Sequence, residues 1–212
     1  MGQTNPSQTN ARHWQLAKQA ANNCNQTFTK EIKSVQKEKR GISDDFITSS
    51  LACSPNFIGC FAENELQTLS VGSFPCYIIV NLDTDQMPGS HWMAIGIFKD
   101  SIEIFDSLGF NVLNWPRVPN CLLRFLHRLS LFRSVQCSKR LQPDESVLCG
   151  FYTLLYIKYR PFFSFHFLEN LFSVDLEQND CILTFIFNKQ ESNYSAYTFM
   201  YKISIASENH SV

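Results

Sequence analysis

The chain has 212 residues, which is enough for one domain with a substantial buried core. Its 18 lysine and arginine residues nearly balance 19 aspartate and glutamate residues, so no global charge favours nucleic acid or an anionic membrane surface as a partner. No apolar stretch is long enough to span a membrane, and the polar N-terminus lacks the apolar core of a signal peptide. We therefore expect an intracellular protein that makes no membrane contact.

Three stretches differ in composition. Residues 1–42 are rich in Asn, Gln and Lys, which predicts a flexible or loosely helical extension that cannot bury a core of its own. A folded domain is expected over residues 43–190. The tail over residues 191–212 contains one segment of alternating apolar residues that fits an edge strand.

The folded domain begins with a helix and a strand. Residues 44–54 fit a helix that Ser43 or Asp44 would cap. Residues 56–66 are interpreted as a loop followed by a short helix. Residues 76–83 are almost entirely apolar and predict a buried strand.

Two further strands follow a turn. Residues 91–98 and 101–107 both have strand-like composition, and only Lys99 and Asp100 separate them. A connection this short joins two adjacent strands as an antiparallel hairpin.

Helices dominate the second half of the domain. Residues 118–130 form an amphipathic pattern whose helix would start at Pro119. Residues 149–160 are apolar almost all round and stop before Pro161, which predicts a central buried helix. The expected fold class is α+β: a small antiparallel or mixed sheet packed against helices, with a cysteine at the N-terminus of the central helix.

Eight cysteines are present. Disulfides are disfavoured because nothing directs the chain to an oxidising compartment. Zinc is disfavoured because the sequence has no CxxC or HxxxH pair, so we expect no metal and no required cofactor. Most of the cysteines then behave as small buried hydrophobic side chains. Cys149, at the predicted start of the central helix, is the exception.

Four residues supply, in a fixed order, the parts that a thiol hydrolase needs: His91, Asp106, Gln142 and Cys149. His91 and Asp106 sit at strand ends, on the faces that carry apolar residues. A buried carboxylate needs a partner, and an imidazole from the neighbouring strand supplies one. The alternatives are an Asp in an exposed turn, a solvated loop Gln and a buried core Cys. The combination favours a cysteine peptidase.

The roles follow from these positions. A thiolate of Cys149 would be stabilised by the partial positive charge at the helix N-terminus. Gln142 and the backbone N–H of Cys149 would donate to the oxyanion. Gly150 would let a substrate backbone approach, and Trp92 would form a wall of the cleft, unless it is simply a core residue.

Several motifs resemble the adenain-like cysteine proteases of adenoviruses and of Maverick/Polinton DNA transposons. The motifs are HWMA at 91–94, FDSLGF at 105–110, and Gln142 placed seven residues before Cys149. The order His, acid, Gln, Cys is also that of the wider SUMO-protease clan. The resemblance covers residues 43–160. Asp106 departs from adenain, which has Glu, and agrees with the SUMO proteases.

The resemblance implies an endopeptidase that processes virion or transposon-encoded structural proteins at Gly-containing sites, in a host nucleus or a virion. It also implies activation by DNA or by a peptide linked through a cysteine upstream of Gln142. Cys137 lies closer to Gln142 than the activator cysteine of the family does. A basic set would face DNA or form a solvated helix surface: Arg124, Arg128, Arg133, Lys139 and Arg140. Two other functions stay open, namely a deconjugase of a ubiquitin-like modifier and a non-catalytic capsid or DNA-packaging partner.

Overall fold

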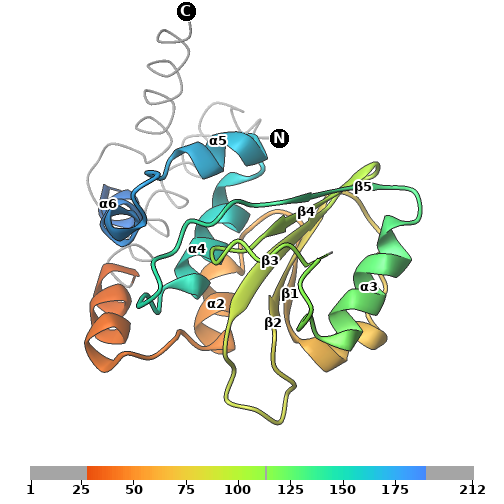
Figure 1. Ribbon diagram of the computed structural model, residues 1–212, viewed down its shortest axis with the longest axis horizontal. Helices are drawn as coiled ribbons and strands as arrows, with labels where there is room; N and C mark the ends of the chain where they lie inside the picture. Colours follow the sequence, from red (N-terminus) through yellow and green to blue (C-terminus); the bar gives the residue numbers. More distant parts are fainter. Residues whose placement is uncertain (1–27, 113, 190–212) are drawn as a thin grey trace, which may run out of the picture. The chain divides into compact units, whose positions relative to one another are not determined.

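The computed structural model describes residues 28–112 and 114–189 (Figure 1). The chain divides into two compact units. One comprises Met1–Ser34 together with Leu183–Val212, and the other is Val35–Ile182. The second unit contains every residue singled out above as a candidate for catalysis.

The described part of the first unit pairs two short segments. The rings of Phe28 and Phe187 pack with centroids 5.0 Å apart. The hydroxyl of Thr29 donates a hydrogen bond to Oδ1 of Asn188 over 2.5 Å. Segments from opposite ends of the sequence therefore meet in this unit.

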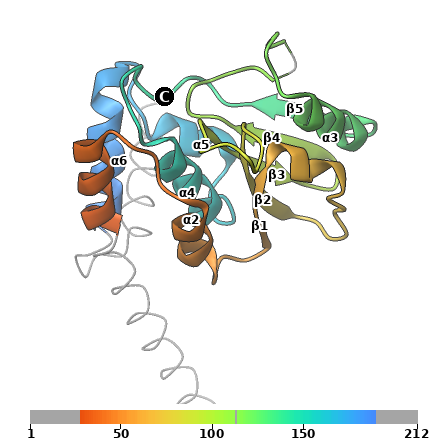
Figure 2. The ribbon, with the colours of Figure 1, turned by 90° about the horizontal axis from the view of Figure 1, so that it is seen from below.

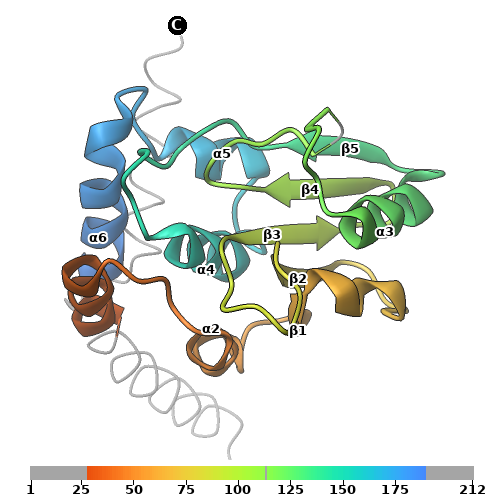
Figure 3. The same cartoon turned by 60° about the horizontal axis from the view of Figure 1, so that its bottom comes forward.

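The second unit is built on a five-stranded sheet whose strands lie in chain order. Its strands are β1 (Phe57–Ala62), β2 (Cys76–Asn81), β3 (Trp92–Ile97), β4 (Ser101–Phe105) and β5 (Ser134–Cys137). The outer pairs β1–β2 and β4–β5 are parallel, whereas β2–β3 and β3–β4 are antiparallel. Figure 3 shows the arrows of β3 and β4 pointing in opposite directions, as in a hairpin. The sheet is therefore mixed.

Helices cover both faces of the sheet. The α-helices with defined bounds are α2 (Asp44–Leu51), α3 (Asn120–Ser130), α4 (Cys149–Tyr159), α5 (Phe165–Asn170) and α6 (Asn179–Lys189). Two short 3-10 helices span Glu63–Gln67 and Leu176–Gln178, and a further helix runs over residues 28–38. Figure 2 shows α3 on one face of the sheet, with α2 and α4 on the other.

The face under α3 is wholly apolar. It is made by alternate residues of the three central strands, among them Ile78, Ile95 and Ile104, which meet Leu122 and Phe125 of α3 in one buried cluster. Burial of side chains of this size stabilises the fold by about 1.5–3 kcal/mol each. This layer fixes the pleat of β3 and β4, and therefore where their ends project.

The opposite face packs on α4, of which every residue except Lys158 is buried. The ring of Tyr156 stacks on Phe105 of β4 with centroids 4.9 Å apart. Its hydroxyl donates to Oε2 of Glu103 over 2.8 Å. Arg160, just past the helix, holds the same carboxylate through Nε at 2.6 Å and Nη2 at 2.7 Å. These contacts hold α4 on the sheet and so set the position of its first residue, Cys149.

The predicted α+β class, the hairpin and the central buried helix are confirmed. The helix expected from Pro119 begins at Asn120, and Ser43 caps α2 by accepting the N–H of Phe46 over 3.2 Å. The prediction of a loop for the first half of residues 56–66 was wrong, because this segment is strand β1. Strand β5 was not predicted.

Part of the expected extension 1–42 is helical. Residues 28–38 are helical because Phe28, Ile32 and Val35 recur at helical spacing, and all three are buried. Ile42 is buried as well. The edge strand expected within residues 191–212 lies outside the described residues.

None of the helices in the part of the chain that the structure describes is long and apolar enough to cross a membrane.

Candidate functional site

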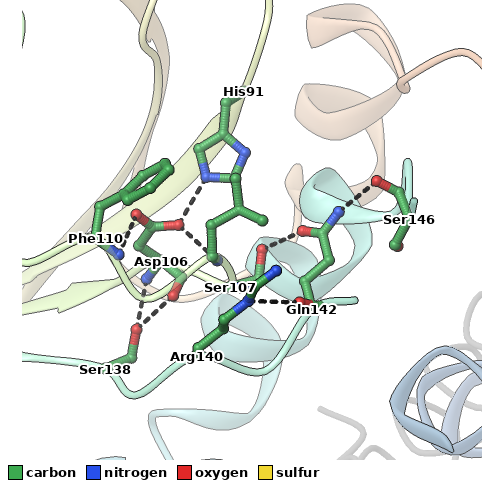
Figure 4. A network of polar contacts seen from close by, with 9 residues as sticks. His91, Asp106, Ser107, Phe110, Ser138, Arg140, Gln142 and Ser146 are labelled. Carbon is green, nitrogen blue, oxygen red and sulfur yellow. Dashed lines mark hydrogen bonds and ion pairs between the residues drawn. The ribbon is translucent and has the colours of Figure 1, made fainter. Parts of the chain in front are cut away.

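The site lies where β3 begins and β4 ends. His91 immediately precedes β3 and Asp106 immediately follows β4, so the hairpin brings their side chains together. Nε2 of His91 lies 2.7 Å from Oδ1 of Asp106, and the two residues are only 7% and 1% exposed (Figure 4). A carboxylate buried this deeply requires a compensating charge or donors, and the imidazole is one of them.

The carboxylate of Asp106 is held from several sides. Oδ1 also accepts the backbone N–H of Leu108 over 2.9 Å, and Oδ2 accepts that of Phe110 over 3.2 Å. The hydroxyl of Ser138 accepts the N–H of Asp106 over 2.8 Å and donates to its carbonyl over 2.7 Å. Asp106 is therefore a fixed acceptor inside the fold, and the alternative of a solvated turn residue does not hold.

The turn that supplies these donors depends on Gly109. Its φ is +70°, in the left-handed region that favours glycine. A Cβ at this position would lie 2.6 Å from the backbone nitrogen of Arg140. The glycine of the FDSLGF motif therefore lets the turn after Asp106 close against the segment that leads to Gln142.

Cys149 is the first residue of α4 and is 7% exposed. Burial lowers the pKa of His91, but the interactions of the ring with Asp106 and with the Cys149 side chain outweigh burial and raise that pKa from 6.5 to about 9. The imidazole thus interacts with both the acid and the thiol, and its raised pKa favours the protonated ring near neutral pH. This arrangement can support a thiolate–imidazolium pair.

The remaining described thiols lie in different surroundings. Seven cysteines are described and all are free. Burial raises the pKa of Cys60 to about 12 and that of Cys76 to about 11. Burial also raises the pKa of Cys137, whose thiol donates to Oδ1 of Asn111 over 3.7 Å. These three thiols resist ionisation near neutral pH.

The structure describes no group of three or more His, Cys, Asp or Glu side chains arranged to hold a metal ion.

Gln142 is 2% exposed, and its amide is held at both ends. Nε2 donates to the carbonyl oxygen of Ser146 over 2.7 Å, and Oε1 accepts from the hydroxyl of Ser107 over 2.6 Å (Figure 4). Gln142 is thus built into the loop that runs towards Cys149. It is not the solvated loop residue that was its alternative.

A groove of about 730 Å³ runs past Cys149. It is lined by residues 39–44, by the end of β1 and by the loop between β2 and β3, together with Trp92 and Cys149. This volume falls in the range of ligand-binding clefts in proteins. The groove can therefore receive a substrate segment beside the thiol.

The loop between β2 and β3 is held by Asn81, a buried residue that the sequence analysis missed. Oδ1 of Asn81 accepts the N–H of Asp83 over 3.0 Å and that of Ser90 over 3.3 Å. The N–H of Leu82 donates to the carbonyl of His91 over 3.0 Å. Asn81 thereby holds both ends of the loop, and Leu82 holds the backbone of the histidine.

Ile42 packs against the first turn of α4. Nε1 of Trp92 donates to the carbonyl of Ile42 over 3.0 Å. A Cβ built on Gly150 would lie 2.4 Å from Cγ1 of Ile42. The need for glycine here comes from this packing, whereas the sequence analysis attributed it to approach of a substrate. Trp92 lines the groove, and its role as a wall of a substrate cleft stays a prediction.

The basic residues assigned to DNA binding make contacts within the protein. Arg128 donates to the carbonyls of Leu66, Gln67 and Leu69. Arg133 donates to the carbonyls of Phe98 and Leu129 and lies over the ring of Phe74. Arg140 pairs with Asp144, Arg124 contacts Sγ of Cys121, and Lys139 contacts Asn170. A DNA-facing role for this set stays a prediction.

Three serines of the site were missed: Ser107, Ser138 and Ser146. Ser107 follows Asp106 directly, and Ser146 lies between Gln142 and Cys149. Their place beside predicted site residues was the available signal. A serine in a loop is ordinarily solvated, so composition alone did not single them out.

The chain matches no family model and no curated protein. Twelve chains of solved structures match it. One is the crystal structure of the selenomethionine ASFV pS273R protease, with 19% identity, a TM-score of 0.39, and coverage of 68% of this chain and 67% of that one. Another is AvrA delL154 with IP6 and CoA, with 14% identity, a TM-score of 0.42, and coverage of 87% and 81%. Likenesses this weak carry no functional assignment.

Proposed function

We propose that this chain is a cysteine peptidase in which Cys149 is the nucleophile, His91 the general base and Asp106 the group that orients His91. The observation that carries the proposal is the buried 2.7 Å contact between Nε2 of His91 and Oδ1 of Asp106. The Cys149 side chain also helps to raise the pKa of this imidazole, so one ring is coupled to both an acid and a thiol. Thiol hydrolases require this combination.

Catalysis then follows from the roles. The sulfur of Cys149 forms a bond to the scissile carbonyl carbon, and the electron pair of the C=O bond moves to oxygen. The N–H of Cys149 and the amide of Gln142 donate to this oxyanion, each being worth about 2.7–4 kcal/mol by comparison with similar sites. His91 gives its proton to the leaving amine as the C–N bond breaks. Water attacks the thioester while His91 takes its proton, and the acid product and the thiol are released.

The substrate would be a protein segment lying in the groove beside Cys149. The resemblance to adenain-like proteases supports an endopeptidase that cuts virion or transposon-encoded structural proteins at Gly-containing sites. That role would place the chain in a host nucleus or a virion. Activation by DNA or by a peptide belongs to the same resemblance.

A fluorogenic Gly-containing peptide tests the proposal. The parent should hydrolyse it, and Cys149→Ala should abolish cleavage while leaving the melting temperature unchanged. Ser130→Ala changes a half-buried serine at the end of α3 that none of the candidate site residues contacts; it is the matched control and should cleave like the parent. A parent that cleaves no peptide under any condition in which it is folded would favour the non-catalytic capsid or DNA-packaging role.

The deconjugase alternative uses the same residues, so a second substrate separates it. A ubiquitin-like modifier that carries a reporter on its di-glycine terminus should be cleaved poorly relative to the peptide. Preference for the modifier by more than roughly tenfold in kcat/KM would replace the endopeptidase assignment with deconjugation.

A further inference from the structure

The amide of Gln142 has only one orientation that its neighbours accept. The carbonyl oxygen of Ser146 can only accept a hydrogen bond, so the group 2.7 Å from it must be the NH₂ of Gln142. Oε1 therefore points the other way, to the hydroxyl of Ser107 at 2.6 Å, which must donate. Because the amide is buried, water cannot substitute for either partner.

One partner of this amide is joined to the acid of the site. Ser107 follows Asp106 in the chain and is completely buried. Its carbonyl accepts the N–H of Leu141 and that of Gln142, both over 2.8 Å. The backbone and the hydroxyl of Ser107 thus both hold Gln142, so the acid and the amide share one rigid support.

The other partner is held by the start of α6. The hydroxyl of Ser146 donates to Oδ1 of Asp180 over 2.9 Å and accepts the N–H of Leu148 over 3.2 Å. The hydroxyl of Tyr152 donates to the same oxygen of Asp180 over 3.1 Å. The carboxylate thereby ties Ser146 to the first turns of α4.

The residue before Asp180 holds the opposite end of the same loop. Nδ2 of Asn179 donates to the carbonyl of Leu141 over 2.8 Å, and Asn179 is completely buried. Two consecutive residues of α6 therefore hold the segment between Leu141 and Leu148 at both of its ends.

We propose that Ser107 and Asp180 are positioning residues that keep the NH₂ of Gln142 turned towards the reacting carbonyl oxygen, Asp180 acting through Ser146. The NH₂ has two hydrogens: one is taken by Ser146, and the other is the donor to the oxyanion. If either Ser107 or Asp180 is replaced by alanine, the amide of Gln142 can rotate away from the reacting carbonyl oxygen. The inference rests on the proposed peptidase function, since it assigns the support of that site's oxyanion donor.

Two reactions of Cys149 separate this role from a general effect on the fold. Peptide hydrolysis develops an oxyanion, whereas alkylation by iodoacetamide displaces iodide from a saturated carbon and develops none. In Ser107→Ala and Asp180→Ala, kcat for the peptide should fall by roughly 10–100-fold, less than the roughly 10²–10³-fold of losing an oxyanion donor outright. KM and the alkylation rate should stay within about twofold of the parent.

Two further comparisons sharpen the test. Asp180→Asn keeps an oxygen that can accept from Ser146 and Tyr152, so it should recover most of the kcat lost in Asp180→Ala. Ser107→Ala should lower kcat no further when Gln142 is already Ala, because Ser107 acts through that amide. Ser130→Ala serves again as the control.

Three results would overturn the positioning role and leave the proposed peptidase in place. The first is an alkylation rate that falls in parallel with kcat. The second is a further loss of kcat when Ser107→Ala is added to Gln142→Ala, and the third is a parental kcat in both Ser107→Ala and Asp180→Ala. A parent that neither hydrolyses peptide nor alkylates selectively at Cys149 overturns the proposed function itself.

Discussion

His91 and Asp106 are 15 residues apart in the chain, yet their side chains meet at 2.7 Å. The contact depends on the register of the β3–β4 hairpin, in which Ala94 lies opposite Phe105. A slip of one residue would turn every side chain of one strand to the other face. Because both faces of this hairpin are buried, the packing that fixes the fold also fixes the pair.

The pair predicts that folding stability depends on pH. The pKa of His91 is raised from 6.5 to about 9 in the folded protein, so its contribution is complete below about pH 6.5 and is lost as the pH rises through about 9. Between about pH 6 and about pH 10, the free energy of unfolding should fall by on the order of 3 kcal/mol more in the parent than in His91→Gln. Urea titrations of both proteins measure this. A difference between them that does not change with pH contradicts the prediction.

Asp106→Asn should retain a trace of activity. An amide can still hold the ring but cannot stabilise imidazolium, and the related substitution in serine proteases lowers kcat by about 10⁴-fold. Because the hydrogen bond to Asp106 helps to raise the pKa of His91, the alkaline limb of the activity profile should move below about pH 9. Asp106→Ala should be worse, since it also removes the acceptor for Leu108 and Phe110. Full activity of Asp106→Ala would exclude a role for the carboxylate.

The parts that the sequence predicted are those determined by local pattern. The hairpin follows from a tight turn between two apolar runs, and α4 from an apolar run that ends at Pro161. Strand β1 was missed because it pairs in parallel with β2 and contains Gly59, and such pairing depends on residues distant in the chain. Strand β5 has only four residues and no fully buried one.

The residues of the candidate site likewise fall into those that the local sequence predicted and those that it did not. Residue type and order identified His91, Asp106, Gln142 and Cys149 as candidates. The serines that hold them became visible only in three dimensions, because their partners come from other segments. Ser138, for example, holds Asp106 across 32 residues of sequence. The burial of Ile42 against Gly150 was likewise hidden, since a polar composition surrounds it.

Ile42 and Gly150 should show compensating effects. Ile42→Ala removes a buried side chain and should cost about 2–3 kcal/mol of unfolding free energy. Gly150→Ala should also destabilise, because its methyl group would overlap Ile42. The double variant should be more stable than the sum of the two single changes predicts, by about 1 kcal/mol. Chemical denaturation of the parent, the two single variants and the double variant measures this coupling free energy. Strictly additive losses of unfolding free energy would contradict the prediction.

Arg160 should contribute to stability through the bidentate pair with Glu103. Arg160→Met leaves the carboxylate buried without a counter-charge and with only the hydroxyl of Tyr156 as a donor, which should cost about 3 kcal/mol. Arg160→Lys should cost less, because it keeps the charge but loses the second hydrogen bond. Arg117→Met, at an exposed position, should stay within about 0.5 kcal/mol of the parent. Equal stability of Arg160→Met and Arg117→Met would show that the pair does not hold α4.

The reactivity of Cys149 tests the central claim most directly. Iodoacetamide labelling near neutral pH, read out by peptide mass spectrometry, compares it with the exposed thiols Cys53 and Cys181 in the same chain. We expect Cys149 to react at least roughly tenfold faster despite its burial, because the imidazolium of His91 stabilises its thiolate. In His91→Ala this advantage should vanish while Cys53 and Cys181 react as before. Labelling of Cys149 slower than that of the exposed thiols in the parent would contradict an activated nucleophile, and with it the proposed peptidase.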